Sequence, residues 1–118
     1  MDHENKTEQA VRIFKALAIE SRVKIIQLLA NRSLCVGALS DMTGISQGAV
    51  SQHLRILRDA GLVTPERNGL YIHYHIPREV HTQIKAVLRN IFEPENITPC
   101  QKGDRKCAKK KSVKNRKT

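Results

Sequence analysis

The segment that most constrains the fold is residues 45–63, ISQGAVSQHLRILRDAGLV. Ser46 is a residue type favoured just before a helix, and Gly61 is one favoured just after a helix ends. Between them, apolar residues recur at spacings of four and three, at Val50, Leu54 and Leu57. This spacing predicts a helix over about residues 47–60, with one apolar face and an opposite polar face.

Three further helical patterns precede this segment. Over residues 7–18 the apolar set is Ala10, Val11, Phe14, Leu17 and Ala18. Over residues 21–31 it is Val23, Ile26, Leu29 and Ala30, and we place the break between these two helices at Ser21–Arg22. Residues 36–43, VGALSDMT, suit a short third helix that ends at Gly44.

After Gly61 the pattern becomes extended. LVTPE and LYIHYHI flank Arg67-Asn68-Gly69, and Asn-Gly favours a tight hairpin turn because both residues tolerate positive φ. Alternation predicts a two-stranded ribbon with one side packed, and Pro65 should lie on an edge strand because it cannot donate a ladder bond. The packed side would carry Leu70, Ile72, Tyr74 and Ile76. After Pro77, a last helix is predicted to end near Phe92, with a stripe formed by Val80, Ile84, Val87, Leu88 and Ile91.

This order of elements predicts a mainly α fold with a β-hairpin wing, a winged helix-turn-helix, over residues 1–93. Residues 94–118 are predicted to form a basic, cysteine-containing tail without ordered structure. The 118-residue chain has a net charge of +10, and residues 100–118 supply +8 of it, from nine basic residues and one acid. Such a tail attracts phosphates in a salt-sensitive way, but it would attract any polyanion.

The amino end and the hydropathy pattern favour a cytoplasmic protein without a membrane partner. No apolar run approaches the ~20 residues needed to cross a bilayer, and MDHENKTEQ lacks the order of a secretion signal. In a reducing compartment, the three cysteines would more often bind metal or react than form structural disulfides. These are Cys35, Cys100 and Cys107.

The polar face of the helix over residues 47–60 suits a DNA groove. Ser, Gln and Arg near a helix amino end can bond base edges and phosphates, and Gly48 allows the backbone to approach closely. On a lone helix, such a face is more often simply solvated. The short helix, the turn and the hairpin around it favour DNA binding. The outer residues are Gln47, Ser51, Gln52, Arg55 and Arg58, with His53 towards one flank.

The runs ALAIESRVKIIQLL, CVGALSDMTGISQGAVSQHLRILRDAGLV and ERNGLYIHYHI resemble the ArsR family of bacterial and archaeal winged-helix repressors, which includes the SmtB-like metal sensors. The resemblance covers about residues 8–92. It implies a homodimer, rather than an enzyme, that binds a palindromic operator in double-stranded DNA and releases it when an inducer binds. It places the reading helix at residues 46–58 and the wing at residues 65–71. The candidate DNA-binding residues are Ser46, Gln47, Gly48, Ser51, Gln52, His53, Arg55, Arg67 and Asn68.

A homodimer through the first and last helices also has a local reason. The apolar stripe of the last helix, with Val11 and Phe14 of the first, exceeds what a domain of about 90 residues can easily cover. Two-fold pairing would cover it and place two reading helices about 34 Å apart. The alternative is that both stripes belong to the core of a monomer.

Candidate inducer residues are the cysteines. The family's Cys-x-Cys site is incomplete, because Cys35 matches its first position but Gly37 occupies the second. A family site on the last helix is also discounted, since Glu79 and His81 lack its full spacing. Cys35, Cys100 and Cys107 could instead bind As(III) or a soft metal ion as inducer, with no cofactor required.

Three alternatives remain open. Cys100 and Cys107 could close a disulfide or polysulfide link, which would make the protein a redox or sulfur sensor, or the thiols could be incidental. The basic tail could serve a sequence-tolerant nucleoid-binding protein. A thiol enzyme is disfavoured because no base or oxyanion donor accompanies these cysteines.

Overall fold

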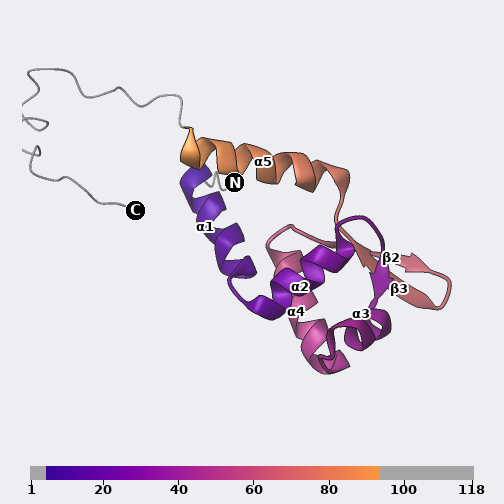
Figure 1. Ribbon diagram of the computed structural model, residues 1–118. Coiled ribbons are helices and arrows are strands. Elements are labelled where there is room, and N and C mark those ends of the chain that lie inside the picture. Colours follow the sequence, from indigo (N-terminus) through magenta and orange to yellow (C-terminus); the bar gives the residue numbers. More distant parts are fainter. Residues whose placement is uncertain (1–4, 94–118) are drawn as a thin grey trace, which may run out of the picture.

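The computed structural model describes residues 5–93 as five helices and one small sheet. In chain order these are α1 (Lys6–Leu17), α2 (Glu20–Leu29), β1 (Leu34–Cys35), α3 (Val36–Thr43), α4 (Gln47–Asp59), β2 (Thr64–Asn68), β3 (Tyr71–His75) and α5 (Arg78–Phe92). Helix α5 lies at one end of the domain and α3 at the other, while the β2–β3 hairpin projects to one side (Figure 1). This is the predicted winged helix-turn-helix. Within the described part, no helix is long and apolar enough to span a bilayer.

Local capping explains where the helices begin and end. Asn5 and Glu8 form a reciprocal capping box at α1, in which the Glu8 amide donates to Asn5 Oδ1 at 2.7 Å. At α4, Ser46 Oγ accepts from the Ala49 amide at 3.2 Å, so Ser46 caps the helix as predicted. The break between α1 and α2 falls at residues 18–19, three positions before the predicted break.

The sheet has three strands, in the antiparallel order β1-β3-β2. The predicted two-stranded hairpin is present as β2 and β3, and β1 adds a third strand that the sequence did not predict, because two residues are too few to produce a detectable alternation. Pro65 lies on the edge strand β2, as predicted. The turn is one residue later than the Asn-Gly pair suggested. Asn68 pairs with Tyr71, which leaves Gly69 and Leu70 as the loop, with Gly69 at φ 68°.

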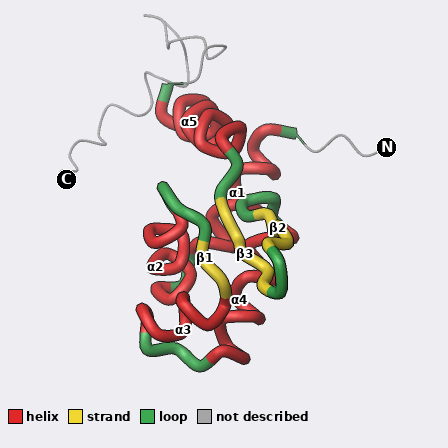
Figure 2. Tube along the Cα trace, turned by 90° about the vertical axis from the view of Figure 1, so that its right-hand side faces the viewer, coloured by secondary structure: helices red, strands yellow, loops and turns green. Residues whose placement is uncertain are grey.

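Helices α2, α3 and α4 lie together (Figure 2) and supply the largest fully buried side chains, while α1 and α5 extend the core with further buried residues. Val50, Leu54 and Leu57 are fully buried, as predicted for the inner face of α4. The inner faces of the first two helices were assigned less well. Helix α1 buries Ile13 while Val11 and Phe14 remain exposed, and α2 buries Ile25 while Val23 is 38% exposed. Both helices carry apolar residues on more than one face, so periodicity alone did not decide which face packs inward.

Candidate nucleic-acid interface

The turn between α3 and α4 is held by side-chain hydroxyls as well as by backbone bonds. Gly44 ends α3 at φ 78°, and its amide donates to the Ser40 carbonyl at 2.9 Å. Ser40 Oγ donates to the Ile45 carbonyl at 2.6 Å. Thr43 Oγ1 donates to the Leu39 carbonyl at 2.7 Å and accepts from the Ile45 amide at 3.2 Å. These bonds fix how α4 leaves α3, and the sequence reasoning did not identify the two hydroxyls.

The carboxyl end of α4 is equally well defined. The Leu62 amide donates to the Leu57 carbonyl and the Gly61 amide to the Arg58 carbonyl, both at 2.9 Å, and Gly61 has φ 80°. This pair of bonds is a Schellman motif, which closes the helix and sets the direction of the following chain. The hairpin therefore leaves α4 at a fixed angle.

The outward face of α4 gathers most of the predicted DNA-binding residues. Ser46 through Gly48, Ser51, Gln52 and Arg55 are all exposed, opposite the buried apolar face. The chain has no acidic residue between Asp41 and Asp59. A helix amino end with free backbone amides attracts anions, including phosphates. A β-carbon placed on Gly48 would meet nothing within 4 Å, so the fold itself does not require glycine there.

His53 lies apart from that exposed face. Its ring is half-buried, and Nδ1 accepts a hydrogen bond from Arg22 Nε at 3.2 Å. Arg22 Nη1 in turn donates to the Ala16 carbonyl at 3.2 Å. Burial lowers the pKa of His53, and the charge of Arg22 lowers it further, so the ring is neutral at pH 7. The chain Ala16–Arg22–His53 ties α1 and α2 to α4, which sequence reasoning did not foresee.

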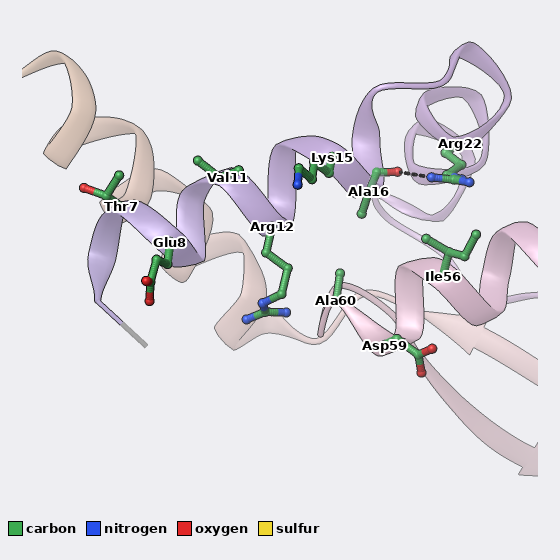
Figure 3. A pocket seen from close by; sticks show the side chains of 10 residues that line it. All are labelled: Thr7, Glu8, Val11, Arg12, Lys15, Ala16, Arg22, Ile56, Asp59 and Ala60. Atoms are coloured by element: carbon green, nitrogen blue, oxygen red, sulfur yellow. Dashed lines mark hydrogen bonds between the residues drawn. The ribbon is translucent and has the colours of Figure 1, made fainter. Parts of the chain in front are cut away.

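A groove of about 690 Å³ lies between α1 and α4 (Figure 3). Its walls carry charges of both signs, including Lys15 from α1 and Asp59 from α4. Ala16 and Arg22 border it, so their hydrogen bond lies beside open space rather than deep in the core.

The hairpin places Arg67 and Asn68 near its end, both exposed. The loop itself, however, consists of Gly69 and Leu70, and the Leu70 side chain is 92% exposed. The prediction that Leu70 and Ile72 share a packed side with Tyr74 and Ile76 was therefore wrong at the tip. Only Tyr74 and Ile76 pack against the core, because the hairpin extends beyond it.

Comparisons with known proteins decide what kind of domain this is. A family model described as "Bacterial regulatory protein, arsR family" matches residues 20–64. The HTH-type transcriptional regulator YgaV of Escherichia coli (strain K12) is 36% identical over 88 residues, covering 74% of this chain and 89% of the relative. The chain belongs to the ArsR family. The arsenical resistance operon repressor of the same organism is 33% identical over 97 residues, covering 69% of this chain and 83% of the repressor.

The fold of this ArsR-family chain also matches solved structures. The homodimeric winged helix-turn-helix DNA-binding domain Mb0332 from Mycobacterium bovis superposes with a TM-score of 0.60 at 29% identity, covering 79% of this chain and 90% of that domain. ArsR-family proteins are transcriptional regulators rather than enzymes. This chain is accordingly a DNA-binding regulator of transcription with a winged helix-turn-helix.

The cysteines of this ArsR-family chain are only partly covered by the structure. Cys35 is a free thiol at the N-cap of α3, where Sγ accepts from the Ala38 amide at 3.4 Å. Within residues 5–93, no three His, Cys, Asp or Glu side chains come together as a metal site. Cys100 and Cys107 lie outside the described residues, so the three-cysteine site stays a prediction.

Proposed function

We propose that this ArsR-family protein is a dimeric repressor that reads a palindromic operator with α4 of each protomer and releases it when an inducer binds. The observation that carries the proposal is the outer face of α4. Its exposed side chains can form hydrogen bonds, and the apolar face opposite them is fully buried. The sequence has no acidic residue between Asp41 and Asp59. Gln47 and Gln52 have the amide geometry that pairs with adenine edges. Ser46, Ser51 and Arg55 suit phosphates or bases, and Arg67 and Asn68 of the wing suit the adjacent backbone.

His53 takes a different role in this proposal from the one expected from sequence. Its ring is half-buried and its Nδ1 accepts from Arg22, so we assign it to positioning α4 rather than to reading a base. The residues that contact DNA directly are then the exposed ones.

The dimer is supported by apolar side chains left exposed on two helices that pack together. Val11 and Phe14 of α1 and Leu88, Ile91 and Phe92 of α5 are exposed in the isolated protomer. Covering such a surface favours two-fold association. The relative Mb0332, which has the same fold, is homodimeric.

For the inducer, we propose a thiophilic metal or metalloid, with arsenite as the first choice, bound by Cys35, Cys100 and Cys107. Three thiols would replace the three hydroxyl groups of arsenous acid, each hydroxyl leaving as water with one thiol proton, to give As(III) with three sulfur ligands. Binding at Cys35 Sγ would remove its bond to the Ala38 amide at the start of α3. A relative of this chain is an arsenical resistance operon repressor, which supports this choice. Oxidation of Cys100 and Cys107 is the second candidate signal.

The test begins with DNA selected by the purified protein from a random pool, followed by anisotropy titrations on selected and scrambled duplexes. Gln52→Ala should weaken binding to the selected site by about 1–3 kcal/mol while leaving scrambled DNA unaffected. Gln27→Ala, an exposed glutamine on α2, is the matched control and should bind as the parent does. Equal losses on both duplexes would contradict base reading by α4.

The inducer is tested on the same selected duplex. Arsenite should release the parent but not Cys35→Ser, and mass spectrometry should find one arsenic on the parent. If persulfide or an oxidant releases the duplex but arsenite does not, and Cys35→Ser responds like the parent, the inducer is a redox or sulfur signal rather than a metalloid. If no serine variant of the three cysteines alters release, neither thiol mechanism holds.

A further inference from the structure

A second pocket is bounded by the end of α1, by α2, by the first half of α5 and by the residues at the two ends of the hairpin. It shares no lining residue with the groove between α1 and α4. Its volume is about 300 Å³, at the small end of the range for small-molecule sites. Seven of its nine lining residues are aliphatic. Leu62 and Val80 among them are buried, and Ile26 and Ile84 are partly buried against the core. The pocket therefore opens onto the hydrophobic core.

Two basic side chains complete the lining. His81 and Lys85 are four positions apart on α5, so they lie on the same side of that helix, and both are exposed. In the part of the chain that the structure describes, neither has a hydrogen bond or an ion pair. Lys85 carries a positive charge, and the His81 ring has an N–H donor in either protonation state. No acidic residue lines the pocket. An aliphatic cavity thus carries donors for one anionic group.

The chemistry of the pocket selects a small molecule over the tail of this chain or the proposed dimer surface. Residues 100–118 carry a net charge of +8, so the basic side chains of the pocket repel them. The exposed apolar residues of α5 that we assign to the dimer lie further along the helix, at residues 88–92. The pocket uses residues 80–85 of the same helix. Its occupant should therefore be apolar, small and negatively charged at one end.

We propose that this pocket binds a medium-chain alkyl carboxylate, with the alkyl chain among the aliphatic side chains and the carboxylate accepting hydrogen bonds from Lys85 and His81. An alkyl chain fits better than a ring system, because no aromatic side chain lines the pocket to stack on one. The ligand would contact α5, which carries part of the proposed dimer surface, and Leu62, whose amide closes α4. This inference concerns binding alone and does not depend on the reading of DNA by α4.

The test is calorimetric titration of the full chain with hexanoate, octanoate and decanoate, each below the concentration at which it forms micelles. One ligand should bind per protomer. Affinity should rise about fourfold for each added methylene group, because each is buried among aliphatic side chains. Decanol has the same alkyl chain without the charge, and it should bind about tenfold more weakly than decanoate.

Three variants locate the site. Lys85→Gln should weaken decanoate binding about tenfold and leave decanol binding unchanged, since only the carboxylate loses a partner. Lys24→Gln removes the same charge from an exposed lysine of α2 outside the pocket, and it should bind decanoate as the parent does. Ala30 is exposed and lines the pocket, so Ala30→Leu should fill the cavity and weaken both ligands. Circular dichroism checks that each variant is folded.

Four outcomes would overturn this inference. The parent could fail to bind decanoate, as it would if a second copy of the chain covered the pocket. Affinity could be independent of chain length, or Ala30→Leu could bind decanoate as the parent does. Equal losses in Lys85→Gln and Lys24→Gln would show attraction by the overall charge of the protein instead of a contact with Lys85. None of these outcomes bears on DNA binding, which is measured separately.

Discussion

The outer face of α4 and the outer faces of α1 and α5 are both exposed, yet they offer different chemistry. On the outer face of α4, over residues 46–55, the exposed side chains are amides, hydroxyls and an arginine, opposite a fully buried apolar face. On α1 and α5 they include Phe14, Leu88 and Phe92. The first surface suits a hydrated polyanion and the second suits another apolar surface. The comparison teaches that the chemistry of an exposed face, more than its exposure, indicates its partner.

The largest effect is expected inside α4, where the comparison can be sharpened on one helix. Leu57→Ala removes a fully buried side chain and should lower the free energy of unfolding by about 2–5 kcal/mol. Arg55→Ala, on the outer face, should change it by about 0.5 kcal/mol or less while weakening DNA binding. Urea unfolding at one protein concentration measures both. Similar destabilisation by the two variants would contradict the division of α4 into a core face and a binding face.

The apolar surface is tested by placing a charge on it. Phe14→Glu should weaken self-association by about 2–4 kcal/mol, or roughly thirty- to thousandfold, because the carboxylate would be buried against the partner. Sedimentation equilibrium gives the dimer constant, and circular dichroism checks the fold. Gln83→Glu, an exposed position on α5, is the control for added charge. If the parent sediments as a monomer, the apolar surface of α1 and α5 does not bind a second copy. Its contrast with the DNA-binding face of α4 then fails.

His53, the residue of α4 that is bonded to Arg22 of α2, offers a smaller, pH-dependent test. Its pKa is lowered in the folded state by burial and by Arg22, so the unfolded chain takes up a proton first. The contribution of the neutral ring to stability is complete above about pH 6.5 and is lost as the pH falls towards the lowered folded pKa. His53→Gln should lack this part of the acid-side decline in urea midpoints between pH 7.5 and 5.5. An unchanged decline would remove His53 as its source.

Gly48 should give the smallest effect on the fold. Gly48→Ala meets open space and should stabilise α4 by up to about 1 kcal/mol, because alanine favours helix. If the backbone of α4 approaches DNA here, the same variant should bind the selected duplex more weakly. Greater stability together with unchanged DNA binding would show that the added methyl group meets no DNA.

Sequence reasoning was most successful where one residue type had one physical reason to be present. Ser46, Gly44 and Gly61 marked helix ends correctly, and the spacing of Val50, Leu54 and Leu57 gave the inner face of α4. Sequence reasoning assigned the inner face less well in the first two helices, because each carries apolar residues on more than one face. It also missed features that depend on residues distant in sequence, above all the bond between Arg22 and His53, which are 31 positions apart.

The two-residue strand β1 gives Cys35 an unusual mechanical position. The same residue pairs with His73 in the sheet and caps the first turn of α3. The backbone of Cys35 thus belongs to the sheet that carries the wing, and its sulfur to the cap of the helix that leads into α4. An adduct on Sγ would disturb the cap directly and would reach the wing only through the backbone of this one residue.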